Sequence, residues 1–331
     1  MASLAKAAGF RLFNSVALLL AVVVLNFILI HSAPGDPAEV IAGEMGGSTP
    51  EIMAEIRARY GLDQPLPKQI FIYVKSVASG DLGYSYFFNQ PVSGLILRRV
   101  PPTVLLMVFS LTLAALVGVT LGVISSARPN SPLSHLVTAF SLAGYASPVF
   151  WTGLILMLIF GRFWPIFPIN GMFDVVGGHK GLAYALDVLR HMALPSLTLI
   201  LLNAAQFSRL ARASMLENLS MDYIRTARAK GLSETRVFLG HALRNALMPI
   251  VTMAGLQFGP LLAGAVVVET VFGWPGLGRL VFDSILRRDY PVLLGILLIS
   301  ATMVIVANLL TDILYRVIDP RVGVGRGGPA Q

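Results

Sequence analysis

Six long stretches of this sequence are almost free of charged residues, and they constrain the fold more than any other feature. A helix rises about 1.5 Å per residue and needs roughly 20 apolar residues to cross the hydrocarbon core of a bilayer. The stretches cover residues 12–30, 103–127, 136–161, 192–208, 246–268 and 291–311. Each is long enough to cross, or nearly so, and we expect the helix of the short fourth one to continue past Ser208. Because the apolar runs do not alternate with polar residues, they do not fit the strands of a membrane barrel.

Composition agrees with helices that are solvated by lipid. Hydrophobic residues make up 55% of the 331 residues, and charged residues make up only 13%. The charged share is about half of that in soluble domains, whose cores are too small to bury so much apolar surface. The chain has no cysteine, which excludes disulfides, cysteine nucleophiles and Cys-ligated metals. We therefore predict an all-α integral membrane protein with six transmembrane helices.

The first stretch has two interpretations. With Lys6 and Arg11 in front of it, it is similar to a cleaved signal peptide. However, its apolar run is long, and residues 31–37 offer no clean small-residue cleavage site. We expect it to be retained as the first membrane helix, so that residues 1–31 form the N-terminus and that helix.

The distribution of basic residues predicts the orientation. If the N-terminus is cytoplasmic, 13 of the 25 lysine and arginine residues lie inside. Of the rest, half lie in the 32–102 segment, which is too long for the positive-inside rule to count. Without that segment, most of the basic residues lie on the side of the N-terminus, which predicts that both termini are in the cytoplasm. The net charge of +8 then follows from topology and requires no nucleic-acid partner.

The segments between the spans carry short amphipathic helices. In the outer 32–102 segment, Thr49 can cap a helix that ends at Gly61, and a second helix is expected over 68–79 with Gly80 as its stop. This insertion is either a structural plug or a docking surface. Residues 276–287, with Leu277, Leu280, Val281 and Ile285 on one face, predict a helix lying in the plane of the membrane.

The segment between the fourth and fifth stretches, at about 214–245, is the most informative. Asp222 can cap a helix over 223–230 that Gly231 ends, and Ser233 can cap the next helix. Eight residues make a marginal helix in water, so this one needs a surface to dock on. The alternative is a solvated basic loop that is positive only because of topology.

Several motifs of the chain resemble one family of transporters. Residues 222–233 (DYIRTARAKGLS) and 241–246 (HALRNA) are similar to the cytoplasmic EAA loop of binding-protein-dependent ABC importer permeases, in the dipeptide, oligopeptide and nickel branch. Arg225-Thr226-Ala227 stands at the E-A-A place, Gly231 matches, and the Glu and Pro of the general motif are absent. Residues 34–37 (PGDP), 80–85 (GDLGYS), 269–278 and 288–291 (RDYP) also resemble that branch, the first of them its first membrane subunit, and the motifs follow in order along the whole chain.

The resemblance implies a type I ABC importer permease with a helical outer insertion at 32–102 and a five-helix core at 103–331. It implies a bacterial inner-membrane protein that forms a heterodimer with a second permease, two ATPase subunits that bind ATP and Mg, and an external substrate-binding protein. In this branch that protein sets much of the substrate selectivity. This sequence has no G-x-x-x-x-G-K-S/T loop, so we expect no cofactor and no catalytic or metal site in it. The implied contacts with the ATPase are Tyr223, Arg225, Thr226, Ala227, Arg228, Gly231, His241, Arg244 and Asn245.

Polar residues within the spans are candidates for the translocation path. Asn203, Gln206 and Gln257 either face that path or form hydrogen bonds between helices, and the second role is favoured. Glu269 and Asp312 lie near span ends, where hydration makes a structural role at least as reasonable. Pro148, Pro195, Pro249 and Pro260 either break their helices, which could serve gating, or cause ordinary kinks, and ordinary kinks are favoured. We expect close helix packing at Gly255, Gly259 and Gly264.

Three functions remain in competition at this point. The first is a channel-forming subunit of a peptide importer, with nickel chelates or glutathione as alternative substrates. The second is a secondary transporter, which requires charged residues in mid-span and often an internal repeat. The third is an intramembrane enzyme, for which the spans carry no catalytic motif. The sequence favours the first.

Overall fold

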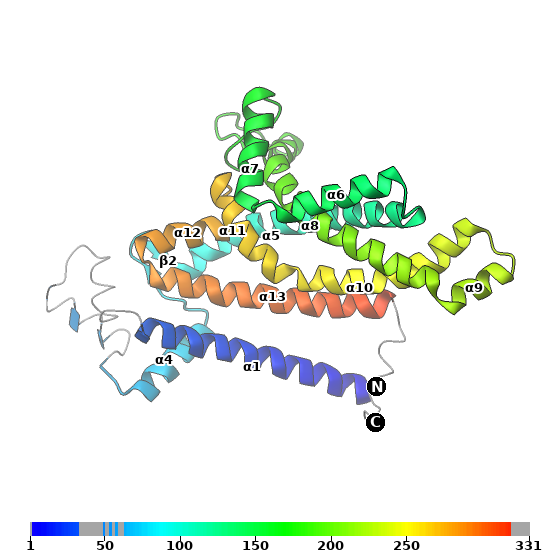
Figure 1. Cartoon of the computed structure of the whole chain (residues 1–331). Coiled ribbons are helices and arrows are strands. Elements are labelled where there is room, and N and C mark those ends of the chain that lie inside the picture. The colour runs from blue at the N-terminus through cyan, green and yellow to red at the C-terminus, as the bar shows by residue number, and fades with distance from the viewer. Residues whose placement is uncertain (1, 33–48, 50–52, 55–56, 59–62, 319–331) are drawn as a thin grey trace. The chain divides into compact units, whose positions relative to one another are not determined.

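The computed structural model of the chain describes residues 2–32, 49, 53–54, 57–58 and 63–318 (Figure 1). Its residues group into two compact units. Unit 1 comprises Met1–Pro101 and Arg279–Ile305, and unit 2 comprises Pro102–Gly278 and Val306–Gln331. The described residues are mostly helical, as the sequence predicts, with one small hairpin and a long irregular loop over residues 164–181. The 34–37 motif and most of the first helix expected in the outer insertion lie outside the described residues.

Unit 1 is built on helix α1 (Ala2–Ser32) and helix α4 (Leu66–Ala78). His31 Nε2 lies 2.9 Å from Gln69 Oε1, which ties the end of α1 to α4. Helix α4 agrees with the helix predicted over 68–79, and it ends where Gly80 adopts a φ of 83°. The sequence did not predict the hairpin of β1 (Tyr84–Ser85) and β2 (Gln90–Pro91), an antiparallel pair whose turn contains Asn89 with φ at 51°.

Three long helices account for three of the predicted spans. They are α5 (Val92–Ala127), α8 (Leu182–Ser220) and α13 (Tyr290–Ile318). Helix α8 continues 12 residues past Ser208, as expected, and it also starts ten residues before the predicted stretch. Pro195 lies inside α8 without ending it.

The third predicted span is broken, and the expectation of an ordinary kink at Pro148 is wrong. Helix α6 (Pro132–Ala146) meets α7 (Val149–Met157) and the π-helical turn η1 (Leu158–Phe163) at an angle of 106° (Figure 1). Ser147 and Pro148 between them are extended, with ψ values of 129° and 136°. Two successive extended residues interrupt the helical path completely, which is why the bend is so sharp.

The fifth predicted span consists of several helical pieces. The π-helical turn η2 (Arg236–Ala242) leads into α10 (Leu243–Leu256), and α11 (Phe258–Val271) follows after Gln257. Pro249 lies within α10, and Pro260 lies in the first turn of α11, where its missing N–H costs nothing. The remaining described helices are α9 (Asp222–Ala229) and α12 (Leu277–Arg287).

Length and composition support at least four membrane-crossing helices in the described part of the chain. Four helices qualify individually, and the bent α6–α7 pair makes five if it is one span. The apolar parts of α1 (Phe13–Leu29) and α11 (Phe258–Val271) are shorter. The count of six therefore stays a prediction. Helix α12 forms as expected, but Ile285 is exposed, whereas Leu277, Leu280 and Ser284 are buried.

Glycines bring helices of unit 2 into close contact. A Cβ at Gly118 would lie 2.6 Å from Ala204 O, and one at Gly122 would lie 2.5 Å from Ser208 O, both backbone atoms of α8. This GxxxG pair was not predicted, although the motif in an apolar helix is a recognised packing signal. Gly255 packs closely on Thr311, as predicted. Gly259 has no atom within 4 Å of its added Cβ, and Gly264 makes only an ordinary contact with Leu199, so tight packing is wrong for these two.

Candidate coupling surface

Helix α9 begins directly where α8 stops. Met221 separates the two helices with an extended backbone, at φ −73° and ψ 152°, and it occupies the N-cap position of α9. The predicted cap, Asp222, is instead the first helical residue, where its carboxylate still lies favourably near the positive end of the helix. The short helix expected from the sequence is therefore present, shifted by one residue, and it projects beyond the ends of α8 and α10 (Figure 1).

A small apolar core of the same chain holds one face of α9. Ile224 is fully buried and Ala227 is 7% exposed, and both pack in one cluster with residues of α8, η2 and α10. The buried partners in this cluster are Met215, Val237, Ala242 and Ala246. The chain thus supplies the docking surface that an eight-residue helix needs. The side chain of Ala227 faces this core, and its contact with an ATPase stays a prediction.

The opposite face of α9 is exposed and basic. Tyr223, Arg225, Thr226 and Arg228 are all exposed. Both arginines already have acidic neighbours in the chain, because Arg228 makes two hydrogen bonds with Glu234, at 2.9 and 3.2 Å, and Arg225 lies 3.4 Å from Asp222. Exposed ion pairs contribute little free energy, so the arginines can exchange these carboxylates for others at small cost.

Gly231 forms the turn after α9. Its φ is +76°, a region that residues with a Cβ adopt only with strain. The N–H of Gly231 donates to Arg228 O, and that of Leu232 donates to Ala227 O, which closes the end of the helix. The chain then returns through Glu234, where the next helix begins as predicted. Among the residues of the second half of the motif, Arg244 and Asn245 are exposed and His241 is half-buried.

Three amide side chains proposed for the translocation path lie together at the α10–α11 junction. Gln257 Nε2 donates to Asn203 Oδ1 and to Gln206 Oε1, at 2.9 Å each. Asn203 is 3% exposed and also donates to Leu199 O within α8. These hydrogen bonds between helices are the role favoured from the sequence. Gln206 and Gln257 are only partly buried, so they retain accessible polar surface.

Glu269 anchors a turn of unit 2. It is fully buried, its Oε1 accepts a hydrogen bond from Thr103 Oγ1 at 2.7 Å, and its Oε2 accepts one from Gly278 N at 2.6 Å. A Cβ at Gly276 would overlap the carboxylate. This enclosure favours a structural role for Glu269, and its place on the translocation path stays a prediction.

Two family-like motifs 204 residues apart meet within unit 1. Ser85 Oγ donates to Asp289 Oδ2, and Gly83 packs against Pro291 at an ordinary van der Waals distance. Asp289 Oδ1 also accepts the N–H of Val292 at the start of α13. Burial raises the pKa of the Asp289 carboxyl, and the hydrogen bonds from Ser85 and Val292 oppose that rise.

This raised pKa predicts a pH-dependent stability. Between the pKa of Asp289 in the unfolded chain and its higher pKa in the folded chain, the folded state binds more protons. The free energy of unfolding is therefore expected to fall as the pH rises through that interval. Thermal unfolding of the purified chain at a series of pH values measures this fall, and Asp289→Asn is expected to reduce it. If both proteins show the same pH dependence, the raised pKa is wrong.

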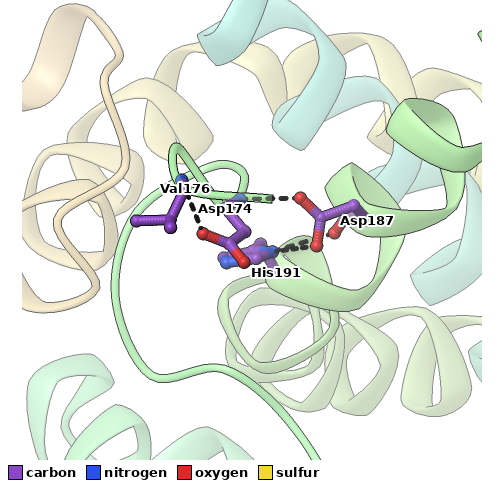
Figure 2. Close-up of polar contacts among 4 residues, drawn as sticks. All are labelled: Asp174, Val176, Asp187 and His191. Atoms are coloured by element: carbon purple, nitrogen blue, oxygen red, sulfur yellow. Dashed lines mark hydrogen bonds and ion pairs between the residues drawn. The ribbon is translucent and has the colours of Figure 1, made fainter. Parts of the chain in front are cut away.

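A further polar cluster, not foreseen from the sequence, fastens the loop before α8 to that helix (Figure 2). Asp187 Oδ2 accepts the N–H of Asp174 at 2.6 Å, and Asp187 Oδ1 lies 3.2 Å from His191 Nδ1. Asp174 in turn accepts the N–H of Val176 at 2.9 Å. The spacing of Asp187 and His191, one helical turn apart, was the available signal. These hydrogen bonds attach the loop around Asp174 to helix α8.

Comparison with models of protein families shows to which family the chain belongs. The family model described as the binding-protein-dependent transport system inner membrane component matches residues 118–324, and its N-terminal companion matches residues 10–107. The chain belongs to this family. The permease therefore contains in one chain both segments that the family models describe, and the resemblance found in its motifs is confirmed.

Individual relatives agree with this assignment. The permease is 41% identical to the dipeptide transport system permease protein DppB of Escherichia coli, over 91% of this chain and 94% of the relative. It is 42% identical to the di/tripeptide transport system permease protein DppB of Pseudomonas aeruginosa, with the same two shares. It is 39% identical to the oligopeptide transport system permease protein AppB of Bacillus subtilis, over 94% and 97%.

Solved structures support the fold. A structure of the MetNI methionine ABC transporter in an inward-facing conformation matches with a TM-score of 0.51 and 20% identity, over 68% of this chain and 96% of that chain. A crystal structure of an amino acid ABC transporter matches with a TM-score of 0.50 and 16% identity, over 68% and 94%. The permease thus has the type I importer architecture expected from its sequence.

Proposed function

We propose that this permease is a channel-forming subunit of an ATP-driven importer of dipeptides or oligopeptides. The observation that carries the proposal is helix α9, whose buried face is fixed on the chain's own core while its basic face is exposed. The relatives support the substrate class, because they are named for dipeptides, di/tripeptides and oligopeptides. Nickel chelates and glutathione are less favoured, since none of these three names refers to them.

The proposed energy source is a pair of separate ATPase subunits that bind ATP and Mg. Tyr223, Arg225 and Arg228 would contact a groove on one ATPase, where acidic groups replace Asp222 and Glu234 as partners of the arginines. Ile224 and Ala227 share a core with Met215 of α8 and Ala246 of α10. A pull on α9 would therefore be transmitted to both membrane helices together, because a packed core moves as a unit.

The complete importer would contain a second, homologous permease subunit and an external substrate-binding protein. We place both termini and α9 in the cytoplasm, on the bias of basic residues toward that side. Gln206 and Gln257, with accessible amides beside the α10–α11 junction, would line the translocation path. Such groups suit a peptide, whose backbone offers amide donors and acceptors at every residue.

The ATPase activity of the reconstituted complex tests this function. With the binding protein present, peptides of two to several residues are expected to stimulate hydrolysis, because the loaded binding protein favours the outward-open state. Titration with peptides of increasing length measures the substrate range. Nickel chelates and glutathione serve as comparison substrates. Stimulation by these compounds and by no peptide would contradict the proposal.

A further inference from the structure

A cavity of about 240 Å³ lies between α6 and α8 in unit 2. Its walls are largely apolar and include Val137 and Leu216, while Thr138 and Ser141 supply hydroxyl groups. Arg209 and Arg212 of α8 border the same cavity. The two arginines are three residues apart and therefore lie on one side of the helix. The cavity thus combines a concentrated positive charge with an apolar wall.

Neither arginine has an acidic partner among the described side chains. No described carboxylate lies within ion-pair distance of Arg209 or Arg212, in contrast to Arg225 and Arg228 of α9. Arg212 donates to Thr138 Oγ1 at 2.6 Å and to Pro129 O at 3.2 Å, and its buried Nε has no acceptor. The Arg209 guanidinium lies 4.5 Å from the centre of the Tyr145 ring. A buried guanidinium N–H without an acceptor is costly and indicates a missing anionic partner.

The position of the cavity favours a lipid as the source of that anion. Pro129 lies in the polar loop of residues 128–131, which joins the end of α5 to the start of α6. Arg212 contacts this loop directly, so the cavity lies at the level where a span leaves the bilayer. Arginines at that level attract anionic headgroups, and an apolar wall accommodates glycerol and the first acyl carbons.

We propose that this cavity, the α6–α8 cavity, binds the phosphate of an anionic phospholipid. Arg209 and Arg212 would donate charge-assisted hydrogen bonds to the phosphate oxygens, and Ser141 would donate from its hydroxyl. The Thr138 hydroxyl donates to Ser134 O and accepts from Arg212, so it would hold that guanidinium in place. Free phosphate offers the same oxygens but leaves the apolar wall uncovered. The lipid satisfies both parts of the cavity, and its binding does not depend on which side of the membrane the loop faces.

Native mass spectrometry of the full chain tests the proposal. The chain is reconstituted in nanodiscs of dioleoylphosphatidylcholine that contain increasing amounts of dioleoylphosphatidylglycerol. After its release from the nanodiscs, the number of phosphatidylglycerol molecules that stay bound to each chain is measured. The Arg209→Gln/Arg212→Gln variant is expected to bind phosphatidylglycerol about tenfold more weakly than the unmodified chain. Arg128→Gln is the control for a single charge and pairs with Arg209→Gln, because each removes one positive charge from an exposed residue and Arg128 lies in the 128–131 loop itself. It is expected to retain nearly full binding.

Further measurements keep the result interpretable. Arg209→Gln alone alters an exposed side chain and is expected to weaken binding severalfold without affecting thermal unfolding. Equal phosphatidylglycerol counts for the double variant and the unmodified chain would overturn the proposal. Equal losses in the Arg128→Gln control would also overturn it, since they would indicate a general charge effect. A third measurement adds inorganic phosphate to the chain in detergent. If the phosphate binds but displaces no phosphatidylglycerol, the two do not share the cavity and the proposal is overturned.

Discussion

The substitution Gly122→Ala is expected to destabilise the permease by about 1–3 kcal/mol, the usual cost of forcing an extra methyl group into a packed interface. The new Cβ would lie 2.5 Å from Ser208 O and 3.0 Å from Arg212 N. Both are backbone atoms of α8, so no side-chain rotation can relieve the overlap, and α5 and α8 must separate. Thermal unfolding of the detergent-purified chain, with the yield of monodisperse protein, measures the loss.

The same substitution at Gly94 provides the matched control. Gly94 lies in the same helix, and an added Cβ there meets no atom within 4 Å. Alanine favours a helix over glycine by about 1 kcal/mol, so Gly94→Ala is expected to be neutral or slightly stabilising. Gly122→Ala should therefore lower the free energy of unfolding, whereas Gly94→Ala should not. Equal stability of both would show that α5 and α8 are not in close contact at Gly122.

The sequence predicted the local structure of several elements because their signals are local. A glycine ends α4 at Gly80 and α9 at Gly231, and both have a positive φ. A glycine tolerates that conformation without strain, so the stop can be recognised from the sequence alone. The extension of α8 past Ser208 was expected for a similar reason, since nothing in the following residues breaks a helix. The bounds of the other spans depended on less specific signals.

Features that depend on distant residues were not predictable in this way. The carboxylate of Glu269 accepts a hydrogen bond from Thr103, which lies 166 residues away in the sequence, so the sequence alone could not decide between a structural role and a place on the path. The angle of the bend after Ser147 could not be predicted without knowing which helices cover α7, because a proline permits many bend angles and packing selects one. One such packing contact joins Gly153 of α7 to Phe272, which would lie 3.2 Å from a Cβ added to the glycine.

Helix α9 shows the same division within a few residues. The spacing of four places Tyr223 and Ala227 on one side of a helix, where both could dock on the same surface. The structure instead buries the pair Ile224 and Ala227, three residues apart, and exposes Tyr223. The residues that cover this pair, Val237 and Ala242, belong to the next helical segment. A helical wheel identifies faces, but it does not show which face the rest of the chain covers.

The substitution Gly231→Val is expected to abolish coupled uptake and to leave membrane insertion intact. A valine at φ +76° costs roughly 1–2 kcal/mol if the backbone holds its conformation. Helix α9 has eight residues and one small core, so it is more easily displaced than the valine is accommodated. Uptake of a labelled dipeptide by cells that express the complete importer measures the loss, and membrane fractionation measures insertion.

A side chain at position 231 could be harmful because of backbone strain or because a partner approaches too closely, and Gly231→Asn separates these two causes. An added Cβ at this position meets no atom of the chain within 4 Å, so within the permease only the backbone conformation opposes substitution. Asparagine adopts a positive φ more readily than other residues with a Cβ, and this variant is expected to retain most uptake. If asparagine abolishes uptake as valine does, a partner must approach Gly231 too closely for any side chain. Undiminished uptake by the valine variant would contradict the coupling role of α9 itself, because a displaced helix would then transmit the ATPase motion as well as the native one.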